Sequence, residues 1–251
     1  SGVEILKERK LLYFVMPMRS MKTVTSLLTA YKGGYTNMLF VTLKKAIRDI
    51  KSDYKKIGLT DKINLTVINF ESVHKVGSDF DLVIIDEAHK IGSFTKQGAC
   101  KAPISMVKLK QICKGLPIIL LSGTPTPESF SQIYHQFYAS DYTPFDFHPT
   151  NWDKTGFINW FNRYGKLEYI KINGFEKKVY SNCDANLYLN LVKPFMLSCT
   201  MEEAGVKDDT EVNVLYVPPD IKTIDAVKTM HRCFQCDIND YKIIAETPAA
   251  Y

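Results

Sequence analysis

The sequence lacks any run of about 18 to 20 consecutive apolar residues, the length that a helix needs to span a bilayer. Its first ten residues, SGVEILKERK, also lack the apolar stretch that follows the charges of a secretory signal peptide. These absences argue against a membrane-spanning or secreted protein. We therefore expect an intracellular, cytoplasmic protein (nuclear if eukaryotic) with no membrane partner.

Cysteine is scarce, with six scattered residues in 251, and a chain of this length can bury a core without disulfides. We expect free thiols. One pair, Cys233 and Cys236 with His231 nearby, has the spacing of metal ligands. A structural zinc site would need a second pair, and the sequence has none, so an incidental pair is favoured over zinc.

The composition is that of an ordinary globular protein, with 45% hydrophobic and 24% charged residues, so we expect no long disordered region. The net charge of +5 and the pI near 8.7 favour an acidic partner only weakly.

Short apolar runs alternate with helical patterns along the first 140 residues. One helix stripe follows Lys22 and ends at the glycines 33–34, and another, over 43–57, is lysine-rich on its outer face. Further stripes contain Met106 and Phe130. The expected strands are 11–16, 38–41, 65–70, 81–86 and 118–122. This alternation predicts an α/β fold, a parallel sheet with helices on both faces.

The character changes near residue 141, where aromatic residues become frequent. Stripes such as Phe157, Trp160 and Tyr164 predict an aromatic-rich helical appendage over 141–200. We expect these aromatics to pack in a core rather than to stack on single-stranded bases. The alternating pattern at 211–217 predicts a returning strand, and the two prolines 218–219 mark a boundary.

Three of the expected strands end in sequences suited to phosphate chemistry, MPMRSMKT (16–23), DEAH (86–89) and SGTP (122–125). Ligands of parallel sheets bind beyond the carboxyl ends of the strands. Asp86 can hold Mg²⁺ through water, and Glu87 can orient or deprotonate the attacking water. The alternative is an acidic helix cap, which the helix dipole favours, but the four letters after an apolar strand favour the functional interpretation.

The stretch 16–23 is typical of a loop that wraps backbone N–H groups around phosphates at a helix N-terminus. Lys22 would neutralise the β- and γ-phosphates and Thr23 would ligate Mg²⁺, with Arg19, Ser20 and Met21 contributing backbone. Met21 stands where glycine is expected. A non-glycine residue held at positive φ costs about 1–3 kcal/mol, which weakens such a site without abolishing it, so a nucleotide-competent loop is favoured over a degenerate one.

These motifs resemble those of superfamily 2 helicases and translocases. DEAH resembles their motif II, and LLSGTPTPES (120–129) resembles motif III; the resemblance implies that His89, Ser122, Gly123 and Thr124 couple the nucleotide site to the nucleic-acid path. LFVTLKKAI (39–47) is similar to motif Ia, which implies that Thr42, Lys44 and Lys45 contact DNA. VINFESVHKV (67–76) is similar to the NYESL stretch of Swi/Snf-type ATPases.

The resemblance covers nearly the whole chain and is strong for the Swi/Snf-like helicases of bacteriophages, which often write the phosphate loop as Met-Arg-x-Gly-Lys-Thr. The segment beginning KPFMLSCT (193–200) is similar to the one that closes their first lobe, but Ser198 and Cys199 replace the usual arginines.

This resemblance implies a RecA-like P-loop NTPase lobe with ATP and Mg²⁺ as cofactors, catalytic residues Lys22, Asp86 and Glu87, and duplex or single-stranded DNA as partner. The implied domains are lobe 1 (1–140), the appendage (141–200), a strand closing lobe 1 (201–217), and a linker with the start of a second lobe (218–251). We expect a fragment of a longer protein, nearly inactive without its second RecA-like lobe.

Two functions remain open from the sequence. In the first, the chain is the ATP-binding lobe of an ATP-dependent DNA helicase or translocase. In the second, it is a degenerate, non-catalytic DNA- or protein-binding module whose site Met21 has closed. The presence of Lys22, Thr23, Asp86 and Glu87 favours the first. The lysine-rich face of 43–57 could follow phosphates, but a solvated helix face is the more ordinary interpretation.

Overall fold

The computed structural model describes residues 1–17, 19–91, 104–126, 130–145, 154–172, 174–184, 190–200 and 202–203. Ser1–Lys207 form one compact unit and Asp208–Tyr251 a second. The predicted strand 211–217, the linker 218–251 and the Cys233–Cys236 pair lie outside the described residues.

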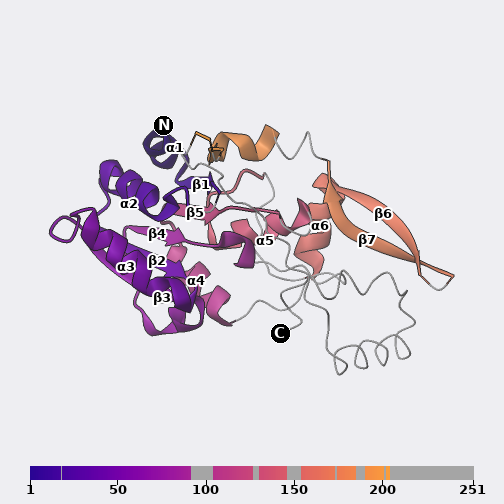
Figure 1. Cartoon of the computed structure of the whole chain (residues 1–251). Helices are drawn as coiled ribbons and strands as arrows, with labels where there is room; N and C mark the ends of the chain where they lie inside the picture. Colours follow the sequence, from indigo (N-terminus) through magenta and orange to yellow (C-terminus); the bar gives the residue numbers. More distant parts are fainter. Residues whose placement is uncertain are drawn as a thin grey trace, which may run out of the picture. The chain divides into compact units, whose positions relative to one another are not determined.

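The main element is a sheet of six strands in the order β3-β2-β4-β5-β1-β8, and every neighbouring pair is parallel (Figure 1). The strands are β1 (Leu11–Val15), β2 (Asn37–Thr42), β3 (Asn64–Asn69), β4 (Leu82–Ile85), β5 (Ile118–Ser122) and β8 (Met196–Ser198). The first five coincide with the predicted strands to within a residue or two, so the predicted parallel α/β sheet is confirmed.

Alternate residues of each strand enter two separate cores, one on each face of the sheet. On β1, Leu11 and Tyr13 belong to one core, whereas Leu12 and Phe14 belong to the other. The four inner strands β1, β2, β4 and β5 are buried on both faces, which explains their continuous apolar runs.

Helices from different parts of the chain cover the two faces. The core that contains Leu12 receives side chains from α1 (Gly2–Arg9), α2 (Lys22–Gly33) and α3 (Ile47–Lys56). The opposite core receives them from α4 (Ile104–Cys113), α5 (Ile133–Gln136) and α6 (Lys154–Tyr164). Short 3₁₀ turns complete the covering: η1 (Lys44–Ala46), η2 (Phe70–Lys75), η3 (Ala88–Ile91), η4 (Phe130–Gln132), η5 (Phe137–Ala139) and η6 (Lys193–Phe195). The sequence patterns did not predict α1.

The expectation of a helical segment over 141–200 is only partly met. Helix α6 forms as expected, but β6 (Gly165–Ile172) and β7 (Phe175–Cys183) make a two-stranded antiparallel ribbon, so the helical prediction is wrong there (Figure 1). The segment 196–198, also expected to be helical, is β8, which pairs with β1. Strand β8 therefore extends the main sheet from within the expected appendage.

The aromatic residues of α6 pack as the sequence analysis expects. Trp160 and Phe157 are fully buried, and both rings contact that of Tyr134, with centroid distances of 5.3 and 5.6 Å. These side chains are therefore inaccessible to nucleic-acid bases. Among the residues that the structure describes, no helix combines the length and the apolar character that crossing a membrane requires.

Candidate functional site

The three motif loops meet at one edge of the sheet because their strands are neighbours. Strand β5 lies between β1 and β4, and Val15 pairs with Ser122. The backbone N–H of Met16 donates to the Ser122 carbonyl at 3.1 Å. Strand β4 ends at Ile85, one residue before Asp86, whose N–H donates to the carbonyl of Val41 on β2 at 2.8 Å. The carboxyl ends of four strands thus surround a common site.

Lys22 is the first residue of α2, at the end of the phosphate-type loop. Its Nζ donates to the carbonyl oxygens of Met16 and Pro17, each at 3.1 Å. Ser20 is buried, and its hydroxyl donates to the same Pro17 carbonyl at 2.7 Å. The hydrogen-bond acceptors of the lysine ammonium are therefore carbonyl oxygens of its own loop.

Met21 is the N-cap of α2 and adopts the left-handed conformation, with φ 59° and ψ 33°. Met21 is 65% exposed. Arg19, two residues earlier, also has a positive φ of 65°. A left-handed conformation costs a non-glycine residue on the order of 1–2 kcal/mol. The backbone at Met21 therefore has the conformation for which glycine would be chosen.

The carboxylate of Asp86 accepts a hydrogen bond from a buried threonine. The Thr42 hydroxyl, at the end of β2, donates to Asp86 Oδ2 at 2.7 Å. Burial raises the pKa of Asp86, the hydrogen bond from Thr42 opposes this, and the charge of Glu87 raises the pKa further. The positive charge of Lys22 acts in the opposite direction, which places it within electrostatic reach of Asp86.

This position of Thr42 corrects one assignment from the sequence. Thr42 was expected among the DNA-contacting residues, but its side chain is fully buried and bonded to Asp86, so that side chain cannot reach DNA. Lys44 and Lys45, in η1, are exposed as that assignment requires.

His89 joins the DEAH and SGTP segments. Its Nδ1 lies 2.8 Å from Ser122 Oγ and 3.4 Å from Glu87 Oε2. The Thr124 backbone N–H donates to the same Ser122 hydroxyl at 3.1 Å. Burial lowers the pKa of His89, whereas the negative charge of Glu87 raises it. Glu87 itself has a positive φ of 50°. Of the four non-glycine residues with positive φ in the described chain, Arg19, Met21 and Glu87 lie in these loops, and the fourth, Lys10, caps α1.

A second link to the SGTP segment was missed by the sequence analysis. The Tyr13 hydroxyl of β1 donates to Gln136 Oε1, and Gln136 Nε2 donates to the Pro125 carbonyl, both at 2.5 Å. Both side chains are fully buried. In the sequence, Gln136 is a polar residue next to the apolar stripe of its helix, and this position indicates a buried hydrogen bond. Its partner cannot be identified from the sequence, because Tyr13 is 123 positions away.

The residues at this edge fit a magnesium nucleotide. Mg²⁺ is usually held by one or two carboxylates together with phosphate oxygens and water, not by an all-protein cage. The Asp86 carboxylate and the hydroxyl of Thr23, in the first turn of α2, are oxygen donors of that kind. Within the described ranges, no group of three or more His, Cys, Asp or Glu residues could hold a metal by itself.

Comparison with known proteins does not identify a family. No protein-family model and no curated protein sequence matches the chain. A solved structure titled "PigF with SAH" is similar over 72% of this chain and 60% of its own, with 11% sequence identity and a TM-score of 0.28. The chain thus spans 60% of the length of that structure.

Proposed function

We propose that the chain is the ATP-binding, RecA-like lobe of an ATP-dependent DNA helicase or translocase of the Swi/Snf-like type. The observation that carries the proposal is the position of Lys22. It begins the helix that follows β1, and Asp86 directly follows β4, which lies on the other side of β5 in the same sheet. A lysine at a helix N-terminus opposite a strand-end aspartate is the arrangement used to hold a magnesium nucleotide.

The strand order also supports this function, because it differs from the order of dinucleotide-binding sheets and brings the three motif loops side by side. In the dinucleotide-binding order 3-2-1-4-5-6, the first strand lies between the second and the fourth. Here β1 lies between β5 and β8, and β5 separates it from β4. The SGTP segment is thereby placed between the phosphate-type loop and the DEAH segment, where it can contact both.

Each residue then has a defined task. Lys22 exchanges the carbonyls of Met16 and Pro17 for the β- and γ-phosphates, while the N–H groups of the first turn of α2 face the same anion. Asp86 and Thr23 would hold Mg²⁺, which supplies charge neutralisation at the phosphates. Glu87 orients and deprotonates the attacking water. His89 and Ser122 transmit the state of this site to the SGTP segment through their 2.8 Å contact.

The alternative is a degenerate, non-catalytic binding module with the same fold. Its support is that Lys22 is satisfied by its own loop and that Met21 replaces glycine. That alternative is weakened because Lys22, Thr23, Asp86 and Glu87, the four residues that a working site needs, are all present.

The deciding experiment measures equilibrium binding of Mg-ATP to the chain by calorimetry. Lys22→Ala should raise the Kd at least about tenfold, since it removes a charge-assisted contact worth about 1.5–3 kcal/mol. Lys32→Ala, at the other end of the same helix, is the matched control and should bind as the parent chain does. SAH, the molecule named with PigF, serves as the comparison ligand. Equal affinities of the Lys22 and Lys32 variants, or binding of SAH in preference to ATP, would contradict the proposal.

Hydrolysis is measured in the protein that includes the second lobe, with and without duplex and single-stranded DNA. Glu87→Gln is the blank. Turnover that DNA stimulates and that the blank lacks is the expected result. Tight ATP binding with no turnover above the blank would leave only the binding module.

A further inference from the structure

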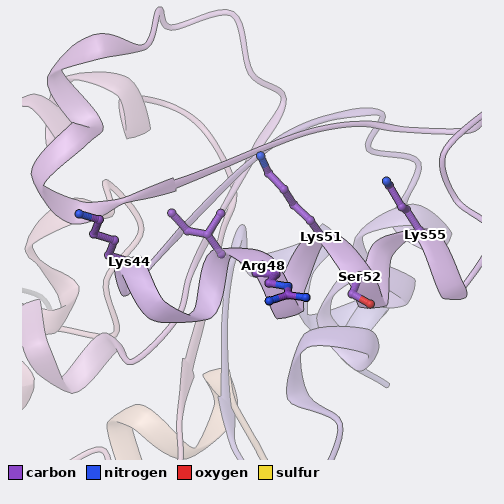
Figure 2. Close-up of a pocket in the computed structure, with 6 residues that line it drawn as sticks. Lys44, Arg48, Lys51, Ser52 and Lys55 are labelled. Atoms are coloured by element: carbon purple, nitrogen blue, oxygen red, sulfur yellow. The ribbon is translucent and has the colours of Figure 1, made fainter.

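Four basic side chains form a ridge along η1 and α3, which we call the α3 ridge: Lys44, Arg48, Lys51 and Lys55. Figure 2 shows them following one another along the helix, with Ser52 beside them. Together with Ile47 and Ser52 they line a surface depression of about 690 Å³. All four basic residues are exposed.

The ridge is a one-sided distribution of charge. At 3.6 residues per turn, Arg48, Lys51 and Lys55 fall within about 60° of one another around the helix axis. The two acidic residues of α3, Asp49 and Asp53, lie more than about 100° from the middle of that face. Asp53 is 3.9 Å from Lys56, which is outside the ridge.

The ridge is therefore uncompensated. Among the described residues, no ion pair joins any of its four cations to a carboxylate. Like charges three and four positions apart on a helix destabilise it slightly. The ridge has four positive charges, and both acidic residues of α3 lie elsewhere on the helix. Such a surface is suited to bind an external polyanion, whose negative charges would form ion pairs with the four cations.

The spacing of the ridge matches a nucleic-acid backbone. From Lys44 to Lys55 the axial rise is about 16 Å at 1.5 Å per residue. One strand of a duplex presents a phosphate about every 3.4 Å along its axis, so four cations face about five phosphates. The three lysine ammonium groups are point charges on flexible stems, and contacts from basic side chains to phosphates carry no information on base sequence.

The ridge also begins next to the candidate nucleotide site. Thr42, which bonds Asp86, ends β2, and only Leu43 separates it from Lys44. A strand held along the ridge would thus pass from the edge of the sheet that carries the motif loops onto the outer face of α3.

We propose that the α3 ridge binds the phosphate backbone of DNA independently of base sequence, with Arg48, Lys51 and Lys55 as contacts additional to Lys44 and Lys45. The choice of DNA as the polyanion rests on the proposed function. The physical requirement is a row of phosphates, which either a duplex or a single strand provides.

The test measures binding of a fluorescent duplex and of the corresponding single strand by anisotropy, without nucleotide, over a series of salt concentrations. The variant is Arg48→Gln/Lys51→Gln/Lys55→Gln. Its matched control, Lys7→Gln/Lys32→Gln/Lys75→Gln, removes the same charge from exposed positions outside the ridge. Circular dichroism confirms that both variants fold.

The ridge variant should bind DNA at least about tenfold more weakly and should reduce the slope of log K against log salt by about 2 to 3. Each lost phosphate contact changes that slope by about 0.9 on a duplex and about 0.7 on a single strand, so three lost contacts give a change of about 2.7 or about 2.1. The form that the parent chain binds more tightly is the preferred one. The control variant should change the slope by less than the value of one phosphate contact, which is about 0.9 on a duplex. Equal slopes in the two variants would overturn the proposal.

Two further arms separate this proposal from its alternatives. If the ridge variant loses binding to vesicles containing phosphatidylserine while its DNA slope stays unchanged, the ridge is a lipid surface and the proposal is overturned. Mg-ATP binding should be unchanged in the ridge variant, and Lys22→Ala should keep the salt slope of the parent chain. A DNA slope that depends on the ridge, in a chain that does not bind ATP, would therefore reject the proposed function and retain the ridge.

Discussion

His89 Nδ1 lies 2.8 Å from Ser122 Oγ, and this contact joins the end of β4 to the end of β5. The Ser122 hydroxyl also accepts from the Thr124 N–H at 3.1 Å and is fully buried. One hydroxyl thus fixes both the histidine of the DEAH segment and the backbone of the SGTP segment. It is the physical link through which the two segments can respond to each other.

Ser122→Ala should therefore destabilise the chain by about 1–3 kcal/mol, because it removes two hydrogen bonds, one with the half-buried ring of His89 and one from the Thr124 N–H, each worth about 0.5–1.5 kcal/mol. Urea unfolding followed by circular dichroism measures the change. Ser52→Ala on α3 is the control, and its effect should stay within about 0.5 kcal/mol, as for surface substitutions in general. Indistinguishable midpoints for the two variants would show that the contact contributes nothing.

Met21→Gly should change Mg-ATP affinity by less than about threefold, which is under 1 kcal/mol. The fold holds Met21 at φ 59°, so we expect the strain to be a cost of folding and not of ATP binding. The same variant should be stabilised by relief of the left-handed conformation. Met21→Ala is the control, because it removes the side chain but keeps the Cβ and therefore the strain. A rise in affinity of tenfold or more in Met21→Gly alone would instead indicate a degenerate loop.

Asp86→Asn should make the chain more stable at neutral pH while it weakens Mg-ATP binding. Because burial raises the pKa of Asp86 above that in the unfolded chain, the folded state holds the proton more strongly. Stability is therefore lost as pH rises from about 3.9, the ordinary Asp value, through the raised folded-state value. Above that window the ionised carboxylate is a fixed cost, which the neutral amide avoids.

The measurement for Asp86 is thermal unfolding of the parent chain and of Asp86→Asn between pH 3.5 and 8. The difference in Tm should be small at the acid end and should grow, in favour of Asn, as pH rises through the window. A constant difference across the range would mean that the carboxyl titrates normally. A difference that favours Asp at neutral pH would show that its contact with Thr42 outweighs its burial.

Gly165→Ala should cost about 1–3 kcal/mol, the usual effect of overpacking. Gly165 follows α6 directly, and a Cβ there would lie 2.4 Å from the ring of Phe161, which is itself buried. Gly77→Ala is the control, because a Cβ at Gly77 would meet nothing within 4 Å. If both alanine variants unfold at the same urea concentration, the close approach of β6 to α6 does not limit stability.

The sequence by itself determined the five strands β1 to β5 and the fold class. Strands buried on both faces must be apolar throughout, as in IILLS (118–122), and helices that cover a sheet need one apolar stripe. These are local patterns. The three motif segments could also be placed at one edge from sequence, since the carboxyl ends of parallel strands share an edge. The roles of Lys22, Asp86 and Glu87 remain predictions that the experiments above address.

Tertiary structure alone decided which side chains meet. The sequence predicts Thr42 to be a surface residue of motif Ia. The pairing of β2 with β4 instead brings its hydroxyl within hydrogen-bonding distance of Asp86, 44 positions away. The ribbon β6–β7 and strand β8 were missed because residues 165–183 carry alternating charges without a buried apolar face, and because a three-residue strand has too short a pattern to detect. Periodicity specifies the faces of single elements, whereas contacts between distant residues depend on strand order, which the chain fixes only when it folds.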